Sequence, residues 1–440
     1  MFKYQDKLIL VITTILTVLG LFTLVSTSID FDGNIDWTGI VMKQAVFVAL
    51  GVLLYIAVAR IDITYLWHIQ VIAVIYLVTL SLLIATLAFA PAINNAKRWI
   101  LIGGTQFQPS EIAKVTVILV TIGVISLRDK YNEVLLAVIS LILVLPLVVL
   151  IYLQPHGSMA LILLILWFIT AFTFMSNQLR NGLLVGIVVS LLLGGVLFAW
   201  DREITALLLV GVGTVAGIYG IYSKESWRKM FLVALLIGFV GAAVVAAGWD
   251  SFYEALPEHQ KDRIEVFQNP EEADEDKSFN VRQSKVAIGS GQLFGKGFGF
   301  GTQTRLKFLP EHQTDFIFAT FSEQFGWIGS MIVLGLYFTL IARIFWHAVN
   351  DRNSTDGWDA SAVLLAALGF KIMIEVFINI GSNTGVIPAT GIPLPLMSAG
   401  GTVTLMTFVT LGLVQSVISY SAKHPKEVDF IDHDDHSGGL

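Results

Sequence analysis

The chain has 440 residues, of which 55% are hydrophobic and 14% are charged, with a mean hydropathy of +0.76 and a formal net charge of −6. About a quarter of the residues of a soluble domain are charged, so this composition excludes an ordinary soluble enzyme. The absence of cysteine excludes a disulfide framework, a Cys-ligated metal and a thiol nucleophile.

Apolar blocks of about 20 residues recur along the chain, and this length spans the hydrocarbon core of a bilayer. We therefore predict an all-α polytopic membrane protein, a bundle of about ten to twelve transmembrane helices. The first block is too long for a cleaved secretory leader and is predicted to be an uncleaved span. The candidate spans, in chain order, are at about 8–28, 42–59, 70–90, 111–127, 134–153, 157–176, 181–200, 204–222, 229–249, 326–348, 361–383 and 402–420.

The distribution of basic residues predicts the orientation, because cytoplasmic loops carry an excess of Lys and Arg. With both termini in the cytoplasm, thirteen basic residues fall inside, and only Lys97, Arg98 and Arg202 fall in short outer loops. One long loop, about 250–312, then lies outside. Residues 1–422 are predicted to form one transmembrane domain, and the polar, acidic segment 423–440 a disordered cytoplasmic tail.

Three polar regions that are distant in sequence fall on the outer face in this topology. They are 97–114, the long loop 250–312, and 387–402. A transporter would place its substrate site near the bilayer midplane, so this clustering favours a site that opens outward. The apolar stretch 315–325, which follows the long loop, is predicted to lie in the interface or to re-enter the membrane.

Two charged pairs lie within predicted spans. Glu111 and Lys114 are three residues apart at the start of a helix that begins near Ser110, so they share one helical face. A capped helix start explains Ser110 and Glu111. It does not explain Lys114, because a charge one turn into a span is costly and is usually functional, which favours a functional role for Lys114. Lys371 and Glu375, four residues apart, are predicted to form a structural ion pair rather than a proton relay.

The long loop contains an acidic run and a glycine-rich run. Residues 271–276 hold five acids, which by default form a solvated segment, although one Asp in it could act as a general base. The run 289–301 lacks the Ser or Thr that a phosphate-binding loop needs after Lys296, so we predict a turn-rich loop packed tightly on the membrane surface instead. His156 lies at an outer turn, where a single His is usually structural but could be a base.

Four motifs in the same order resemble those of the SEDS family, the bacterial shape, elongation, division and sporulation proteins, over residues 97 to 415. Gly301-Thr302-Gln303 and the Gly-Ile-Pro-Leu-Pro form resemble RodA-type members more than FtsW-type ones. The matching segments are 97–99 with 108–114, 283–303, 309–319, and 391–401.

The resemblance implies a peptidoglycan glycosyltransferase that polymerises lipid II for cell-wall elongation and rod-shape maintenance. It implies the bacterial inner membrane, with the active site facing outward. The implied partners are lipid II, the growing lipid-linked glycan, a class B penicillin-binding protein that crosslinks the glycan, and other membrane proteins of the elongation complex. The basic residues form no stripe of the kind that binds nucleic acid.

The family requires an Asp in the long outer loop, before the Gln-Ser motif. In the segment 269–279 this Asp corresponds best to Asp274, with Asp276 as the second candidate. The chain departs from the family at this motif, because its following Pro and Gly residues are absent. His156 replaces a family Asp, and Ala399 replaces a family Tyr.

The implied mechanism uses Asp274 as the general base on a sugar hydroxyl of incoming lipid II, with preplaced cations at the leaving lipid pyrophosphate. Lys114, oriented by Glu111, would be one such cation, and a divalent cation such as Mg²⁺ or Mn²⁺ could share the charge, although no ligand spacing demonstrates one. The implied substrate-binding residues are Arg98, Lys285, Gln108, Ser110, Gln283, Ser284 and Lys43.

Two other functions remain open at this point. A flippase for a lipid-linked cell-wall precursor would suit the many spans and the intramembrane charges, and a non-catalytic scaffold of the elongation complex would need no base. Both should tolerate replacement of Asp274 by Asn, whereas a polymerase that uses Asp274 should not.

Overall fold

The computed structural model describes residues 4–29, 35–37, 39–92, 96–175, 180, 254, 258–268, 275–305, 308–350 and 360–423. Within these residues, nine helices are long and apolar enough to span a membrane. They are α1 (Lys7–Thr27), α2 (Ile40–Val58), α3 (Ile69–Phe89), α4 (Ser110–Ile125), α5 (Glu133–Leu153), α6 (Gly157–Phe174), α13 (Ile317–Asn350), α14 (Ala360–Thr384) and α15 (Gly401–Lys423).

Each of these helices coincides with a predicted span, so the all-α polytopic class is confirmed. The three spans predicted within 181–249, the acidic segment 271–274 and the tail 424–440 lie outside the described residues. Shorter elements connect the spans. They are the 3-10 helices η1 (Ile63–Trp67) and η2 (Ser126–Asp129), the helices α10 (Glu258–Gln268), α11 (Glu275–Ser290) and α12 (Thr302–Arg305), and the strands β1 (Ile100–Ile102) and β2 (Thr105–Phe107).

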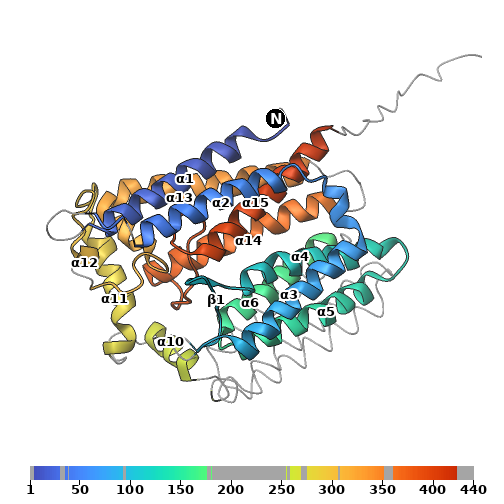
Figure 1. Ribbon diagram of the computed structural model, residues 1–440, viewed down its shortest axis with the longest axis horizontal. Coiled ribbons are helices and arrows are strands. Elements are labelled where there is room, and N and C mark those ends of the chain that lie inside the picture. The colour runs from blue at the N-terminus through green and yellow to red at the C-terminus, as the bar shows by residue number, and fades with distance from the viewer. Residues whose placement is uncertain are drawn as a thin grey trace, which may run out of the picture.

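The spanning helices lie side by side, and α10, α11 and α12 gather at one end of the bundle (Figure 1). Burial separates the helices into two classes. About three quarters of α4, α14 and α15 is buried, whereas only 22% of α2 and of α3 is buried. Lipid tails are as apolar as leucine, so a helix that is apolar all round can face the bilayer, while helices with polar side chains must face other helices. The central position of α4 and α14 therefore follows from their polar residues.

Asp6, directly before α1, contacts the last described helix, α15, at one end of the bundle. Its backbone N–H donates to Gln415 Oε1 at 2.9 Å, and Gln415 Nε2 donates to its carbonyl oxygen at 2.9 Å. Its Oδ1 accepts hydrogen bonds from the backbone N–H of Leu8 and Ile9 and caps α1. Its Oδ2 lies 2.7 Å from Arg343 Nε and 2.7 Å from His347 Nε2, near the end of α13. Burial alone would raise the pKa of Asp6, but these partners and the capping bonds lower it. The two ends are thus on one side, and which membrane face this is stays a prediction.

The segment 317–325 forms the first part of α13 and is buried in the bundle almost throughout. The helix breaks at Gly326, where φ is 67°. The glycine-rich loop packs directly on this break: a Cβ on Gly291 would lie 2.1 Å from the Ser322 carbonyl oxygen, and one on Gly295 would lie 2.1 Å from that of Gln324. The predicted tight packing of this loop is confirmed, but its observed packing partner is the backbone of α13, whereas the sequence predicted the membrane surface. Only glycine permits such a close approach of two backbones.

The two strands form an antiparallel hairpin that directly precedes α4, with Ile100 opposite Phe107 and Ile102 opposite Thr105. Gly103 and Gly104 both have positive φ and form its turn. The hairpin returns the chain from Arg98 to Gln108, and β2 lies against α15. The motif 97–99 with 108–114 is therefore held beside the start of α15, which begins where the motif segment 391–401 ends.

Candidate active site

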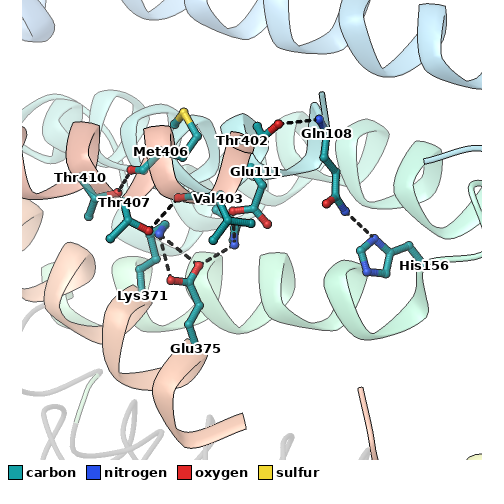
Figure 2. Close-up of polar contacts among 11 residues, drawn as sticks. Gln108, Glu111, His156, Lys371, Glu375, Thr402, Val403, Met406, Thr407 and Thr410 are labelled. Atoms are coloured by element: carbon teal, nitrogen blue, oxygen red, sulfur yellow. Dashed lines mark hydrogen bonds and ion pairs between the residues drawn. The ribbon is translucent and has the colours of Figure 1, made fainter. Parts of the chain in front are cut away.

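Four charged side chains from two helices form one buried group, which we name the buried tetrad: Glu111 and Lys114 of α4 with Lys371 and Glu375 of α14. Glu111, Lys371 and Glu375 are labelled in Figure 2. Lys114 Nζ lies 2.7 Å from Glu111 Oε2 and 2.5 Å from Glu375 Oε1. Lys371 Nζ lies 3.0 Å from Glu375 Oε1. Both pairs predicted from their spacing are confirmed, and Glu375 joins them.

The tetrad is closed and balanced in formal charge. All four residues are between 1% and 2% exposed. Desolvation of an ion costs several kcal/mol in a protein interior, and good geometry with an opposite charge is needed to repay it. Two ammonium groups and two carboxylates meet that requirement. The Lys114 ammonium is enclosed by carboxylates in this structure.

A second charged group lies where the start of α4, the α5–α6 turn, α10 and the segment before α13 meet. We name it the outer cluster: Arg98, His156, Arg263 and Asp315. Arg98 donates hydrogen bonds to the carbonyl oxygens of Gln154 and Pro155, so it holds the turn that carries His156. Arg263 donates to Ser158 Oγ at 3.4 Å and to the Thr390 carbonyl oxygen at 3.2 Å.

His156 is a buried neutral imidazole. Its pKa is lowered to about 3, first by burial and then by the positive charges of Arg98, Lys114 and Arg263. The Gln108 amide nitrogen lies 3.5 Å from His156 Nδ1, and the Gln108 backbone N–H donates to Thr402 Oγ1 at 2.9 Å (Figure 2). His156 thus connects the outer cluster with the motif at the start of α4.

Asp315 lines a cavity of about 200 Å³ together with Arg263, Glu311, Asn280, Ser382 and Thr390. Burial and the neighbouring charge of Glu311 raise the pKa of Asp315 to about 6, although Arg263 and Arg98 act in the opposite direction. Burial lowers the pKa of Arg98 to about 10, and the charge of Arg263 adds to this. Within the described residues, the Asp315 carboxylate forms no ion pair within 4.0 Å. Arg263, Glu311 and Asp315 thus face a cavity instead of pairing with each other.

Comparison with known proteins identifies the family. The family model of the FtsW, RodA and SpoVE cell cycle proteins matches residues 6–206 and 175–423. The chain belongs to this family. It is 30% identical over 355 residues to the peptidoglycan glycosyltransferase MrdB of Escherichia coli K12, which covers 80% of this chain and 79% of MrdB.

Another relative and two solved structures support the same family assignment. The peptidoglycan glycosyltransferase RodA of Treponema pallidum is 28% identical over 432 residues, 94% of this chain and 97% of the relative. The fold resembles that of a chain from a peptidoglycan synthase complex that coordinates polymerisation and crosslinking, with a TM-score of 0.64, 22% identity, and coverage of 96% of this chain and 99% of that chain. The crystal structure of the rod shape determining protein RodA of Thermus thermophilus matches with a TM-score of 0.54, 22% identity, and coverage of 94% and 96%.

The structure brings four of the predicted site residues together in two groups. Arg98 and Gln108 lie with His156, and Glu111 and Lys114 lie in the tetrad one turn below. Ser110 begins α4; its buried hydroxyl has no hydrogen-bond partner among the described residues. Ser284 is buried and donates to the Asn383 carbonyl oxygen at 2.8 Å.

The other predicted residues give less information. Gln283 is partly buried on α11, whereas Lys43 on α2 and Lys285 on α11 are exposed. Asp274 lies outside the described residues. Asp276 lies in the first turn of α11, and only its backbone is described. The roles of these residues therefore stay predictions.

Three residues of the site were not assigned to it from the sequence. Arg263 belongs to the charged half of the long loop, where no motif distinguishes it from other solvated charges. Asp315 lies inside the Thr-Asp-Phe motif, so a signal exists in the sequence, but the prediction for its segment concerns only an interfacial or re-entrant position and assigns Asp315 no role. Glu375 was paired with Lys371, since helical spacing cannot reveal a partner on another helix.

The divalent cation stays an untested prediction. The described residues contain no group of three or more His, Asp or Glu side chains that could hold a metal ion. The whole acidic run 271–276 belongs to the residues whose side chains are not described.

Proposed function

We infer that this protein is a peptidoglycan glycosyltransferase of cell-wall elongation. Family membership, including relatives in E. coli and T. pallidum named for this activity, supports the inference. The structural observation that carries it is the outer cluster. Arg263 and Asp315 line a cavity at the end of the bundle where α10 and α11 lie. Arg98 and the neutral His156 do not line this cavity, but the charge of Arg98 acts on both Asp315 and His156. A reaction that develops negative charge on a leaving pyrophosphate needs preplaced cations of this kind.

The proposed substrate is lipid II, and the acceptor is its sugar hydroxyl. An Asp near the start of α11, Asp274 or Asp276, removes the hydroxyl proton as the oxygen attacks the anomeric carbon of the growing chain. Arg98 and Arg263 stabilise the departing lipid pyrophosphate, because their guanidinium groups bind phosphate oxygens in a bidentate manner. A divalent cation held by the acidic run would share this charge. The proposal thus replaces Lys114 by arginines as the principal cations, since Lys114 is enclosed by two carboxylates.

The proposed setting is the inner membrane, with the outer cluster facing outward. The positive-inside distribution supports this orientation, and the apolar helices support a multi-pass protein. The relative from the peptidoglycan synthase complex supports a crosslinking partner. We propose that this partner is a class B penicillin-binding protein, in an elongation complex with further membrane proteins.

The flippase alternative receives little support from the buried charges. A relay or substrate path needs groups that exchange partners or face a cavity. The tetrad is instead closed, balanced and almost unexposed.

The test is polymerisation of lipid II by the full chain in lipid nanodiscs, with and without a class B penicillin-binding protein, with the products resolved on a gel. Wild type should produce glycan polymer, and Asp274→Asn or Asp276→Asn should abolish it, which would identify the base. If a divalent cation takes part, addition of EDTA should also stop polymerisation. Polymer unaffected by either Asn variant would reject both bases. Lipid II that crosses vesicles without polymerising would support the flippase instead.

A further inference from the structure

Helix α14 carries a stripe of polar residues at intervals of four: Lys371, Glu375, Asn379 and Asn383. Residues at this spacing lie on one helical face. All four are buried, with exposures between 0% and 2%. Polar groups in a transmembrane helix are costly unless they are paired, so a complete stripe needs an explanation.

Asn379 and Asn383, the two residues of the stripe nearest the C-terminal end of α14, hold segments of the motifs 309–319 and 391–401. Asn379 Nδ2 donates to the carbonyl oxygens of Asp315 and Ile392, each at 2.8 Å. Asn383 Nδ2 donates to the Asp315 carbonyl oxygen at 2.9 Å, and Asn383 Oδ1 accepts from the backbone N–H of Ala319 at 3.0 Å. The backbone position of the cavity carboxylate Asp315 is thus fixed twice by α14.

Lys371 and Glu375, the other two residues of the stripe, hold the start of α4. Glu375 contacts Lys114 at 2.5 Å, and Lys371 supplies the second positive charge that keeps the group balanced. Lys114 in turn holds Glu111, three residues after Gln108, the residue beside His156. None of the four sequence motifs includes Lys371, Glu375, Asn379 or Asn383, yet contacts of this stripe reach all of them.

We propose that Glu375 is a positioning residue of the transferase reaction: it fixes Lys114, and with it the start of α4, relative to the α14 face that holds Asp315. The inference rests on the proposed function. Displacement of a reacting group by about 1 Å can reduce the rate by about a hundredfold, and a carboxylate held between two ammonium groups resists such displacement. Lys371 sets the charge balance and has no contact of its own with Lys114.

The experiment separates positioning from charge balance. In Lys371→Met/Glu375→Gln the tetrad loses one positive and one negative charge, so Glu111 and Lys114 remain as a neutral pair. Ser361→Ala is the matched control, because Ser361 is also buried on α14 but lies outside the stripe. Both variants and wild type are reconstituted in nanodiscs, and the melting temperature, kcat and KM for lipid II are measured.

The double variant should melt within a few degrees of wild type, with kcat reduced on the order of tenfold to a hundredfold and KM changed by less than about twofold. The control should match wild type in all three quantities. A double variant with wild-type kcat, or one whose loss lies entirely in KM, would overturn the proposal. Inactive wild-type protein would instead reject the proposed function.

Glu375→Asp decides the matter if the double variant does not fold. It keeps the charge, and therefore the balance of the tetrad, but shortens the reach to Lys114 by one methylene. The proposal expects a folded protein with kcat lowered by about tenfold. Wild-type kcat in folded Glu375→Asp would mean that only the charge matters, and that would overturn the positioning role.

Discussion

The buried tetrad and the outer cluster contain similar kinds of side chains in opposite arrangements. In the tetrad, every charged group contacts an opposite charge within 3.0 Å, and no residue is more than 2% exposed. In the outer cluster, Arg263 and Asp315 line a cavity of about 200 Å³, and Arg98 and Arg263 donate mainly to backbone carbonyl oxygens.

The difference teaches which charges are available to a ligand. In a balanced, closed group every charge already contacts an opposite charge, so the group does not attract a ligand and its contribution is to hold helices in place. Arg98 and Arg263 form no ion pair with the described residues and so can bind an anion, and their positive charges add to burial in lowering the pKa of His156. Burial of charge alone therefore does not identify a catalytic group.

We expect the largest effect from a substitution in the buried tetrad at Lys114. Replacement by Met leaves Glu111 and Glu375 sharing only Lys371, so we expect a loss of about 3–5 kcal/mol, seen as a lower melting temperature and yield. In Lys114→Met/Glu111→Gln the charges balance again, so much of the melting temperature should return. Equal melting temperatures for the single and double variants would contradict the electrostatic account.

Arg263→Gln tests the outer cluster. Loss of a cation aimed at a developing negative charge should reduce kcat by on the order of a hundredfold. The melting temperature should change little, because Arg263 has no carboxylate within 4.0 Å among the described residues. Lys261→Gln, on the same helix but with its ammonium at the Glu254 carbonyl oxygen, is the control for loss of a positive charge. Comparable losses in both variants would mean that only long-range charge matters.

The raised pKa of Asp315 predicts a pH dependence of stability. Between about pH 4 and pH 6 the folded protein retains a proton that the unfolded chain has released, so the stability contributed by this group falls as the pH rises through 6. Relative to Asp315→Asn, wild type should lose on the order of a few degrees in melting temperature between pH 4.5 and 7.5. Parallel melting curves for the two proteins would show that the Asp315 pKa is ordinary.

Lys43→Gln should have the smallest effect on the fold. Lys43 is exposed on α2 and forms no hydrogen bond or ion pair with the described residues, so we expect stability to change by less than about 0.5 kcal/mol. Measurement of the melting temperature checks this. Because stability is unaffected, any rise in KM for lipid II would report directly on substrate contact and would add Lys43 to the outer cluster's ligand site.

Local patterns in the sequence determined the helices and the charged pairs. Blocks of about 20 apolar residues placed each described span, because the bilayer sets the length of a helix. Spacings of three and four residues predicted Glu111–Lys114 and Lys371–Glu375, since neighbours on one helical face meet regardless of the rest of the fold. The four ordered motifs were sufficient to indicate the family.

Only the tertiary structure decided which groups meet across helices. Lys114 and Glu375 are 261 positions apart, and no periodicity relates α4 to α14. Arg263 and Asp315 acquire their roles because α10 and the segment before α13 pack on the same cavity. Burial and neighbouring charge, which no local pattern contains, separate a closed ion group from a site that can accept a ligand.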